Sequence, residues 1–570
     1  MLWGIIGVIA TIVVGIAVGY YFYHRSDKAA KEFQINTTNA LNEMRAYRDG
    51  LPQVRDAKKK KILEEIFQHH KSKSYDLAIR KIEYYLNNFS LTEKERVATL
   101  IIFAIILSNK GSYQEALLIL SEANLVSVRT NNFTALSRLE LLRGHIFGKL
   151  DRYAEALQAL EKAIKLNPQD SVAWCNKGNI LEKLGRRGEA LQALEKSIAL
   201  NPNDAVTWFN LGTVVENLGQ HKRALQALEQ AISLKPDDPE SWGQKGTVLE
   251  KLGQHEAALH ALNKAIDLKP DFAMAWSNKG AALASLGQTE GALQAFEKAI
   301  ALKPDLQEAW HNKGDLLGKL NRNEGALQAI EQAIKLKPDY AGAWNNKGSV
   351  FMNMNRYCDA LIAYEKAIEL KADFPGAWCN KGTALSALGR HDQALKAYDK
   401  AIELKPDYPE AWHNKGSELS DLNRNDEALK AYDKAIEVRP DFQESWINKG
   451  ALLGKLGRRE EALKAYEKAV ELKPLDSGAN KGKGIALWHL GRHEDALKAF
   501  EKAAELGPNN PENWYNKACL LAGLNKKDQA LENLKKAIEI NPSYKEKAQK
   551  DEYFKSLLVD PRFKKLVGKK

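Results

Sequence analysis

The hydrophobic positions of this chain follow two short helical patterns that alternate along most of its length. In residues 171–184 the apolar side chains are spaced as on one face of a helix, and a second such face follows in residues 187–200. Gly185 interrupts the pattern between the two faces. Asn201 and Pro202 end the second, because proline cannot continue a helical hydrogen-bond ladder. The unit is therefore predicted to be a pair of amphipathic helices.

Tryptophan and proline show that this pair recurs every 34 residues. Tryptophan lies at positions 174, 208, 242, 276, 310, 344, 378, 412, 446 and 514. Proline follows in step at positions 168, 202, 236, 270, 304, 338, 406, 440, 474, 508 and 542, with Ala372 in one place. Self-similarity at a fixed period of this length is typical of stacked repeats, which bury a core only against their neighbours.

The unit resembles the tetratricopeptide repeat, whose signature orders Trp, Gly, Ala, a large apolar residue and Pro. Trp174, Gly178, Ala190, Leu194 and Pro202 match it in order and spacing. The chain departs from the signature by placing Lys before most of the repeat glycines, and Leu or Val where an aromatic residue is usual. The resemblance implies an all-α fold, a right-handed superhelical α-solenoid of helix-turn-helix repeats.

Three parts of the chain are expected to form this stack. Residues 137–544 contain twelve repeats in register, and residues 59–136 resemble two divergent repeats followed by a short insertion. Residues 545–570 alternate apolar and charged positions and are predicted to form a capping helix. Such a cap keeps the apolar face of the last repeat out of water.

The first 24 residues predict a transmembrane anchor, joined to the repeats by a juxtamembrane linker at residues 25–58. No charged side chain precedes Arg25, and residues 2–23 would span about 33 Å as a helix. A cleaved signal peptide is the alternative, but a basic start and a small-x-small cleavage site are missing. Because the cations follow the apolar segment, the repeats are predicted to be cytoplasmic in a single-pass membrane protein.

Gly15 and Gly19 have the GxxxG spacing that brings transmembrane helices together, so a homodimer through them is one expectation. Ordinary transmembrane glycines are the alternative. The net charge of +11 gathers at the ends of the chain, since residues 62–544 hold 65 Lys and Arg against 64 Asp and Glu. The repeats therefore have no basic stripe for nucleic acid. The basic residues near the anchor suit either an anionic lipid surface or a solvated linker.

The sequence contains no pattern of catalytic chemistry, so we expect neither an enzyme nor a cofactor nor a metal site. Cys175, Cys358, Cys379 and Cys519 lack metal-ligand spacing, and scattered thiols suit a reducing compartment. The histidines are dispersed, and the glycine turns recur with the repeat instead of forming a phosphate loop.

An asparagine lies two residues after most of the tryptophans, with Gln244 and Gly482 as the exceptions. A side-chain amide matches the N–H and C=O groups of an extended peptide, so these asparagines are the candidate peptide-binding residues. They resemble the asparagine ladder of O-linked N-acetylglucosamine transferase, and a role in packing within the repeats is the alternative. The candidates are Asn176, Asn210, Asn278, Asn312, Asn346, Asn380, Asn414, Asn448 and Asn516.

The predicted function is that of a membrane-anchored protein–protein interaction scaffold, which binds extended peptides or partner domains in its concave groove. A carboxylate clamp is not expected, because Val, Glu and Met occupy positions where clamping family members have basic residues. Two alternatives remain open. One is an envelope or secretion assembly factor exposed outside the cytoplasm, and the other is a regulatory subunit of a separately encoded enzyme.

Overall fold

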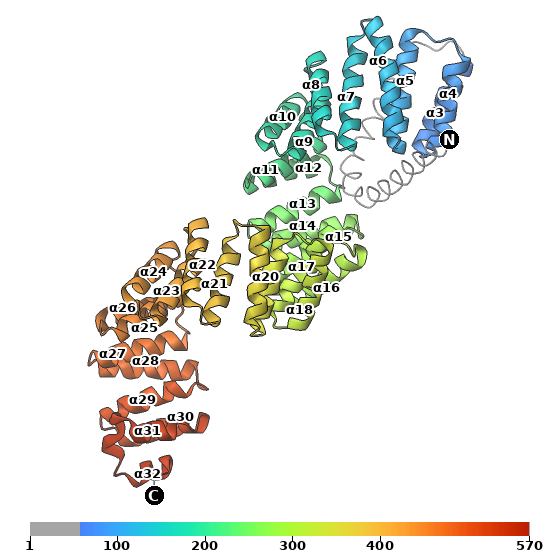
Figure 1. Ribbon diagram of the computed structural model, residues 1–570. Coiled ribbons are helices and arrows are strands. Elements are labelled where there is room, and N and C mark those ends of the chain that lie inside the picture. The colour runs from blue at the N-terminus through green and yellow to red at the C-terminus, as the bar shows by residue number, and fades with distance from the viewer. Residues whose placement is uncertain (1–56, 569–570) are drawn as a thin grey trace, which may run out of the picture. The chain divides into compact units, whose positions relative to one another are not determined.

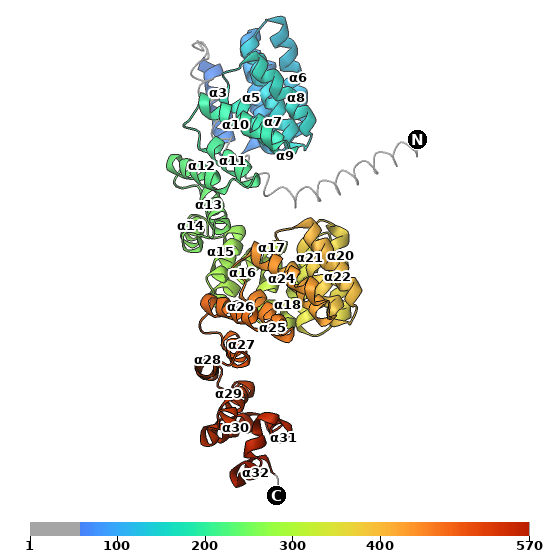
Figure 2. The same ribbon diagram turned by 90° about the vertical axis from the view of Figure 1, so that its left-hand side faces the viewer.

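A computed structural model describes residues 57–568, and all regular elements within that range are helices (Figure 1, Figure 2). They belong to two compact units, divided between Leu302 and Lys303. Each unit is built from consecutive helix pairs, in which a first helix packs antiparallel to a second helix across a short turn. The structure is thus an all-α stack of helix pairs, as the sequence predicts.

In the unit that ends at Leu302, the pairs are coloured blue to green in Figure 1. The first helices are α3 (Ala57–Lys71), α5 (Glu93–Lys110), α7 (Phe133–Lys149), α9 (Ser171–Lys183), α11 (Ala205–Asn217), α13 (Pro239–Lys251) and α15 (Ala273–Ser285). The second helices are α4 (Tyr75–Asn88), α6 (Tyr113–Arg129), α8 (Tyr153–Leu166), α10 (Arg187–Leu200), α12 (His221–Leu234), α14 (His255–Leu268) and α16 (Thr289–Leu302).

The unit that begins at Lys303 continues the same order of elements. Its first helices are α17 (Gln307–Lys319), α19 (Ala341–Asn353), α21 (Pro375–Ala387), α23 (Pro409–Asp421), α25 (Gln443–Lys455), α27 (Ser477–His489) and α29 (Pro511–Gly523). Its second helices are α18 (Asn323–Leu336), α20 (Tyr357–Leu370), α22 (His391–Leu404), α24 (Asn425–Val438), α26 (Arg459–Leu472), α28 (His493–Leu506) and α30 (Lys527–Ile540).

The turn within each pair depends on one residue with left-handed backbone geometry. Gly185 supplies it between α9 and α10 with a φ of +74°. Asparagine takes this role in several repeats, as at Asn321 and Asn423 with φ values of 55° and 57°. Glycine adopts this region without steric cost, and asparagine tolerates it better than other residues. The chain therefore reverses within two or three residues.

The repeat glycines allow the two helices of a pair to cross closely. A Cβ atom on Gly178 would lie 2.6 Å from Cγ of Leu194, and one on Gly382 would lie 2.5 Å from Cε1 of Tyr398. Distances this short are not tolerated between carbon atoms. A bulkier residue at these glycines would therefore push the two helices apart.

Neighbouring pairs are closer together along their first helices than along their second helices. The contacts of α9 with α11, and of α19 with α21, are more extensive than any between the neighbouring second helices α10 and α12, or α20 and α22. Within each unit the stack is therefore tighter on the side of the first helices. We call the side of the first helices that bears the residues one, two and five positions after each tryptophan the first-helix face. Most of these residues are half-buried, and a few, such as Cys175 and Cys379, are buried.

The predictions for the beginning of the chain lie outside the described residues. These are the transmembrane anchor at residues 1–24, the Gly15 and Gly19 pair, and nearly all of the linker at residues 25–58. Among the described helices, none has the length and apolar character needed to cross a bilayer. The region predicted to hold divergent repeats forms the helix pairs α3–α4 and α5–α6. Helix α7 starts at Phe133, inside the predicted insertion.

The C-terminal cap differs from the single helix that the sequence suggests. It consists of α31 (Tyr544–Lys550), the 3-10 helix η1 (Glu552–Leu557) and α32 (Pro561–Val567). Asp551 and Pro561 explain the interruptions, because Asp551 caps η1 and proline starts a new helix at its first position. Phe554, Leu557 and Phe563 are fully buried against the last pair.

Candidate functional site

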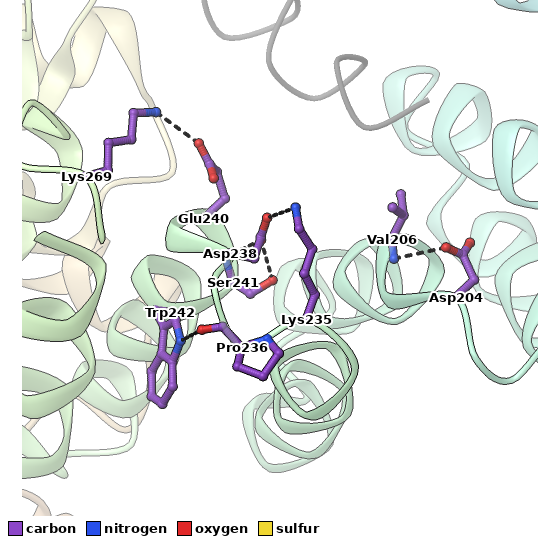
Figure 3. Close-up of polar contacts among 9 residues, drawn as sticks. All are labelled: Asp204, Val206, Lys235, Pro236, Asp238, Glu240, Ser241, Trp242 and Lys269. Atoms are coloured by element: carbon purple, nitrogen blue, oxygen red, sulfur yellow. Dashed lines mark hydrogen bonds and ion pairs between the residues drawn. The ribbon is translucent and has the colours of Figure 1, made fainter. Parts of the chain in front are cut away.

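The tryptophans that define the repeat are half-buried, and each fastens its own first helix to the preceding turn. Nε1 of Trp242 donates a hydrogen bond to the carbonyl oxygen of Pro236 at 2.9 Å (Figure 3). The equivalent bond of Trp378 is to Ala372, which stands where the other repeats have proline. The partner is thus the backbone carbonyl, so the repeat without proline keeps the bond. Where tryptophan is absent, Asn480 donates to Pro474 instead.

The lysine that precedes most of the repeat glycines, unusual for the signature, links neighbouring repeats. Nζ of Lys347 lies 2.8 Å from Oε1 of Glu331 in the preceding second helix and 5.6 Å from the ring centre of Trp344. Lys415 makes the same pair of contacts, with Asp399 and Trp412. Because the acidic partners are exposed, each pair contributes at most about 1 kcal/mol. The lysines of this row are therefore occupied within the stack and are not available to clamp a ligand carboxylate.

The candidate asparagines lie on the first helices, and most of them use their side-chain N–H groups to bind the preceding repeat. Nδ2 of Asn278 donates to Oγ1 of Thr247 at 2.8 Å, and Nδ2 of Asn346 donates to Oδ1 of Asp315 at 2.9 Å. Asn414 and Asn448 make the same bond to Thr383 and Ser417. Asn210 and Asn380 instead donate to Cys175 and Asn345, the residues directly after the preceding tryptophans. The amides therefore join neighbouring first helices.

These bonds leave the other end of several amides unoccupied. Among the described residues, no group donates a hydrogen bond to the carbonyl oxygen of Asn278, Asn380 or Asn414. All three side chains are half-buried, so these oxygens border solvent on the first-helix face. Each oxygen can accept a hydrogen bond from a peptide N–H. The sequence suggested that the amide N–H would also donate to the peptide, but that group is used within the stack.

The remaining candidates are placed differently. Asn176 is buried, and Nδ2 of Asn516 is buried without a partner in the described part of the chain. Asn312 is half-buried on α17. The structure therefore brings together Asn346, Asn380, Asn414 and Asn448 as one continuous row in the second unit, whereas Gln244 interrupts the row in the first.

Buried tyrosines on the second helices, which the sequence analysis does not identify, hydrogen-bond to side chains of the first-helix face. The hydroxyl of Tyr398 on α22 donates to Oγ1 of Thr383 on α21 at 3.4 Å, and Asn414 donates to the same oxygen. Tyr432, Ser417 and Asn448 form the same hydrogen-bond network one repeat later. The signal in the sequence was the pairing of tyrosine on the second helix with serine or threonine after the repeat glycine.

The same hydrogen-bond network explains why position 482 holds glycine instead of asparagine. The preceding repeat has Ala451 where the three repeats before it have Ser349, Thr383 and Ser417, so an asparagine at position 482 would lack this acceptor. The ring of Tyr466 fills the space where a Cβ atom of residue 482 would lie. Burial raises the pKa of Tyr466 to about 12, so its hydroxyl stays protonated. The polar row therefore ends at α25.

Two histidines of the first-helix face are held neutral by their surroundings. Burial lowers the pKa of both His311 and His413 below the ordinary value. The ring of His311 lies 4.7 Å from that of Tyr340, and Nδ1 of His413 lies 2.9 Å from Oγ of Ser445. They act as packing and hydrogen-bonding groups, in agreement with the structural role that their spacing suggested.

The buried thiols on α9 and α21 are unsuited to nucleophilic chemistry at neutral pH. Burial raises the pKa of Cys175 and of Cys379 to about 11 in each case, so both are protonated. Within residues 57–568, no group of three or more His, Cys, Asp or Glu side chains is placed to hold a metal ion. The described first-helix face carries hydrogen-bonding and aromatic side chains that recur with the 34-residue repeat.

Comparison with family models matches tetratricopeptide repeat models to most of the repeat region. The matches described as "Tetratricopeptide repeat" cover residues 171–204, 193–226, 211–275, 273–306, 311–377, 375–408, 409–442, 447–511 and 511–544, and one described as "TPR repeat" covers residues 144–185. Together they run from residue 144 to residue 544 with only short gaps. No curated protein matches the chain.

Solved structures show similar helix stacks. The crystal structure of the APC/C hetero-tetramer Cut9–Hcn1 aligns with a TM-score of 0.51 at 15% sequence identity, covering 90% of this chain and 96% of that chain. At this identity the likeness concerns the fold alone. YrrB, described as a TPR protein with an unusual peptide-binding site, is 28% identical over 33% of this chain and 96% of its own, with a TM-score of 0.28.

Proposed function

Because the chain belongs to the tetratricopeptide repeat family, we propose that it is a scaffold that binds extended segments of partner proteins along its first-helix face. The observation that supports this most strongly is the row of asparagines whose N–H groups are fixed to the preceding repeat while carbonyl oxygens stay unoccupied. An amide held at one end is pre-oriented, so little side-chain entropy is lost when a ligand binds to the other end.

The chemistry of this row favours the backbone of a ligand over its side chains. An unoccupied asparagine oxygen recurs in several repeats, and the residues next to it are mostly small or hydroxylated, such as Ser349, Thr383 and Ser417. An extended backbone presents its own N–H and C=O groups at regular intervals. A scaffold of this kind would accept segments of varied sequence.

Replacing Asn312, Asn346, Asn380 and Asn414 together with alanine tests the proposal. Each ligand hydrogen bond that is lost should weaken binding of a captured partner by roughly 0.5–1.5 kcal/mol. The bonds from Asn346, Asn380 and Asn414 to the preceding repeat are lost as well, so the melting temperature should fall too. Affinity is therefore measured per folded molecule by titration at a temperature below the transition.

The matched control replaces Asn323 and Asn425, which begin the second helices α18 and α24. It removes the same kind of side chain away from the first-helix face, so it should leave affinity unchanged. If the quadruple variant melts earlier but binds the partner as tightly as the parent protein, the asparagines are structural only and the proposal is wrong.

We further propose that residues 1–24 anchor this scaffold in a membrane, with the repeats in the cytoplasm and arranged as a right-handed superhelix. The support is the uncharged apolar segment before Arg25 and the cations that follow it. Protease added to intact cells should leave the repeats uncut, while permeabilised cells should show digestion. Cleavage of the repeats in intact cells would instead place them outside and favour the envelope assembly factor.

A regulatory subunit of a separately encoded enzyme is the remaining alternative. Purification from detergent-solubilised membranes separates it from the scaffold proposal. A single catalytic partner in fixed stoichiometry would support the regulatory subunit, and several weakly held partners would support the scaffold.

A further inference from the structure

Four large apolar side chains are exposed together on α6 and at the start of α7, in the first described helix pairs (Figure 1). They are Leu118 (71% exposed), Leu125 (62%), Val128 (55%) and Phe133 (62%). The three residues of α6 share one helical face, because they are seven and three positions apart. We call these four side chains the outer patch. Grouped apolar side chains at a surface mark contact with a partner or a membrane.

The outer patch departs from the repeat pattern. Helix α8 begins with a tyrosine as α6 does, and its exposed Gln158 and Lys165 occupy the positions of Leu118 and Leu125. Helix α6 also has 17 residues where α8 has 14, and Val128 lies in this extra turn. The exposed leucines and the extra turn bury nothing in the stack, so packing between repeats does not account for them.

A cluster of lysines lies at the same end of the helices as the C-terminal part of the outer patch. Residues 58–61 of α3 are all lysine, and three of them are exposed. Nζ of Lys59 lies 3.9 Å from Oε1 of Glu95 near the start of α5. Arg96, next along α5, pairs at 2.8 Å with Glu122 in the second half of α6. This end of the first unit therefore combines exposed cations with exposed apolar side chains.

The surface of an anionic bilayer matches this combination. Apolar and aromatic side chains enter the boundary between headgroups and acyl chains, and lysines are attracted to anionic headgroups. The outer patch is also close in sequence to the proposed anchor. Residues 25–56 lie between the anchor and α3 and can extend over at most about 110 Å, so the first unit stays within reach of the bilayer.

A protein partner matches the outer patch less well. Each partner of a stable protein complex buries about 800 Å² of surface, which four side chains on one side of a helix do not provide. A bilayer contact can be weaker and still form. The anchor would make it an intramolecular contact, and the high effective concentration replaces intrinsic affinity.

We infer that α6 and the start of α7 lie on the anionic surface of the membrane, with the outer patch in the headgroup boundary and the lysines at positions 58–61 facing the headgroups. This inference rests on the proposed anchor and adds a second membrane contact to it. Because α6 is a second helix, the contact leaves the first-helix face to partner proteins. The first unit would thus be held in one orientation relative to the bilayer.

The test measures whether residue 125 of the full-length protein lies in lipid. Cys358, the exposed cysteine, is replaced with serine, and the other three cysteines are buried. Leu125→Cys then carries an environment-sensitive fluorophore, and the protein is reconstituted in vesicles of phosphatidylcholine and phosphatidylserine. Lipids with a nitroxide on the acyl chain should quench the fluorophore at least about twofold, because interfacial side chains reach about 5–10 Å into the boundary.

A matched control places the same fluorophore at Ile362→Cys, another exposed apolar position of a second helix, where no quenching is expected. A second variant adds Leu118→Gln, Val128→Ser and Phe133→Ser to the labelled Leu125→Cys protein. These positions are exposed, so the fold should persist while quenching at position 125 is lost. Vesicles of phosphatidylcholine alone should show weaker quenching, because the lysines then lack anionic headgroups.

No quenching at position 125, or equal quenching at positions 125 and 362, would overturn the inference. Quenching that persists without the outer patch, or that is unchanged without phosphatidylserine, would overturn it too. A blue-shifted emission without nitroxide quenching would show that protein covers the patch, and this also overturns the inference.

Flotation of the vesicles in alkaline carbonate tests the anchor separately. Protein that floats without quenching at position 125 would keep the anchor and lose the second contact. Quenching of protein that carbonate removes from the vesicles would support the outer patch and overturn the anchor alone. Neither result bears on peptide binding at the first-helix face, which the asparagine variants decide.

Discussion

At the scale of single residues, the stack depends on glycines that let helices cross closely and on polar side chains that hydrogen-bond to a neighbouring repeat. Gly382 lies against Tyr398. Nε1 of Trp378 donates to the backbone carbonyl of Ala372, so this hydrogen bond does not require the proline found in other repeats. The network of Tyr398, Thr383 and Asn414 joins two repeats through one hydroxyl. The repeated residues therefore act mainly between helices and not within them.

Two glycines of the same fold should respond to alanine in opposite directions. Gly382→Ala places a Cβ atom against the Tyr398 ring and should lower the free energy of unfolding by about 1–3 kcal/mol. Gly454→Ala meets no atom within 4 Å and should raise it by up to about 1 kcal/mol, because alanine favours the helix. Urea unfolding measures both. Equal effects of the two substitutions would show that the close crossing at Gly382 does not constrain the repeat.

Acid should destabilise the stack partly through His145 on α7. Burial lowers the pKa of this histidine to about 3, so the folded state keeps it neutral. The unfolded chain binds a proton near pH 6.5, and stability should fall as pH drops from about 6.5 to 3, by up to roughly 1.4 kcal/mol per pH unit. His145→Gln should flatten this dependence, whereas the exposed His260→Gln should not. Identical pH profiles for both variants would contradict the assignment.

At the scale of helices, the boundaries of the repeats could be predicted because each has its own signal. Gly185 and Asn201-Pro202 mark the ends of α9 and α10, and the structure places the turns there. The capping region could not be predicted in the same way. Its apolar spacing resembles one amphipathic helix, and only burial against α29 and α30 shows why the chain breaks at Asp551 and Pro561.

The C-terminal cap should stabilise the last helix pair more than any other. Phe554 is fully buried and its ring lies 5.8 Å from that of Tyr515, so Phe554→Ala should cost about 3–5 kcal/mol. Because coupling in a repeat stack is between neighbours, the loss should concentrate in α29 and α30. Hydrogen exchange by mass spectrometry measures this. Uniform loss of protection across α17–α30 would instead indicate that the unit unfolds as one cooperative block.

Candidate binding residues were only partly accessible from the sequence. The asparagine row could be read from its spacing, but its hydrogen bonds to the preceding repeat could not, since Asn414 and Thr383 are 31 residues apart. The aromatic residue that precedes several first helices is visible as a repeated motif, as at residues 269–272 and 337–340, but its packing against the preceding repeat is known only from the structure.

At the scale of the whole molecule, two units of one architecture offer different surfaces. In the unit that begins at Lys303, the asparagines of α19, α21, α23 and α25 form an unbroken row. In the unit that ends at Leu302, Gln244 interrupts the asparagines, and α9, α11 and α13 begin with aspartate caps. The near balance of charge in residues 62–544 means that long-range attraction contributes little to partner choice.

Photo-crosslinking tests the central claim, that partners bind along the first-helix face, most directly. A photoreactive amino acid replaces Asn345 or Ser349 on α19, or Ile362 on the second helix α20, in otherwise unaltered full-length protein. With a captured partner bound, positions 345 and 349 should crosslink to it, and position 362 should not. Crosslinking from position 362, with none from the two positions on α19, would contradict the account.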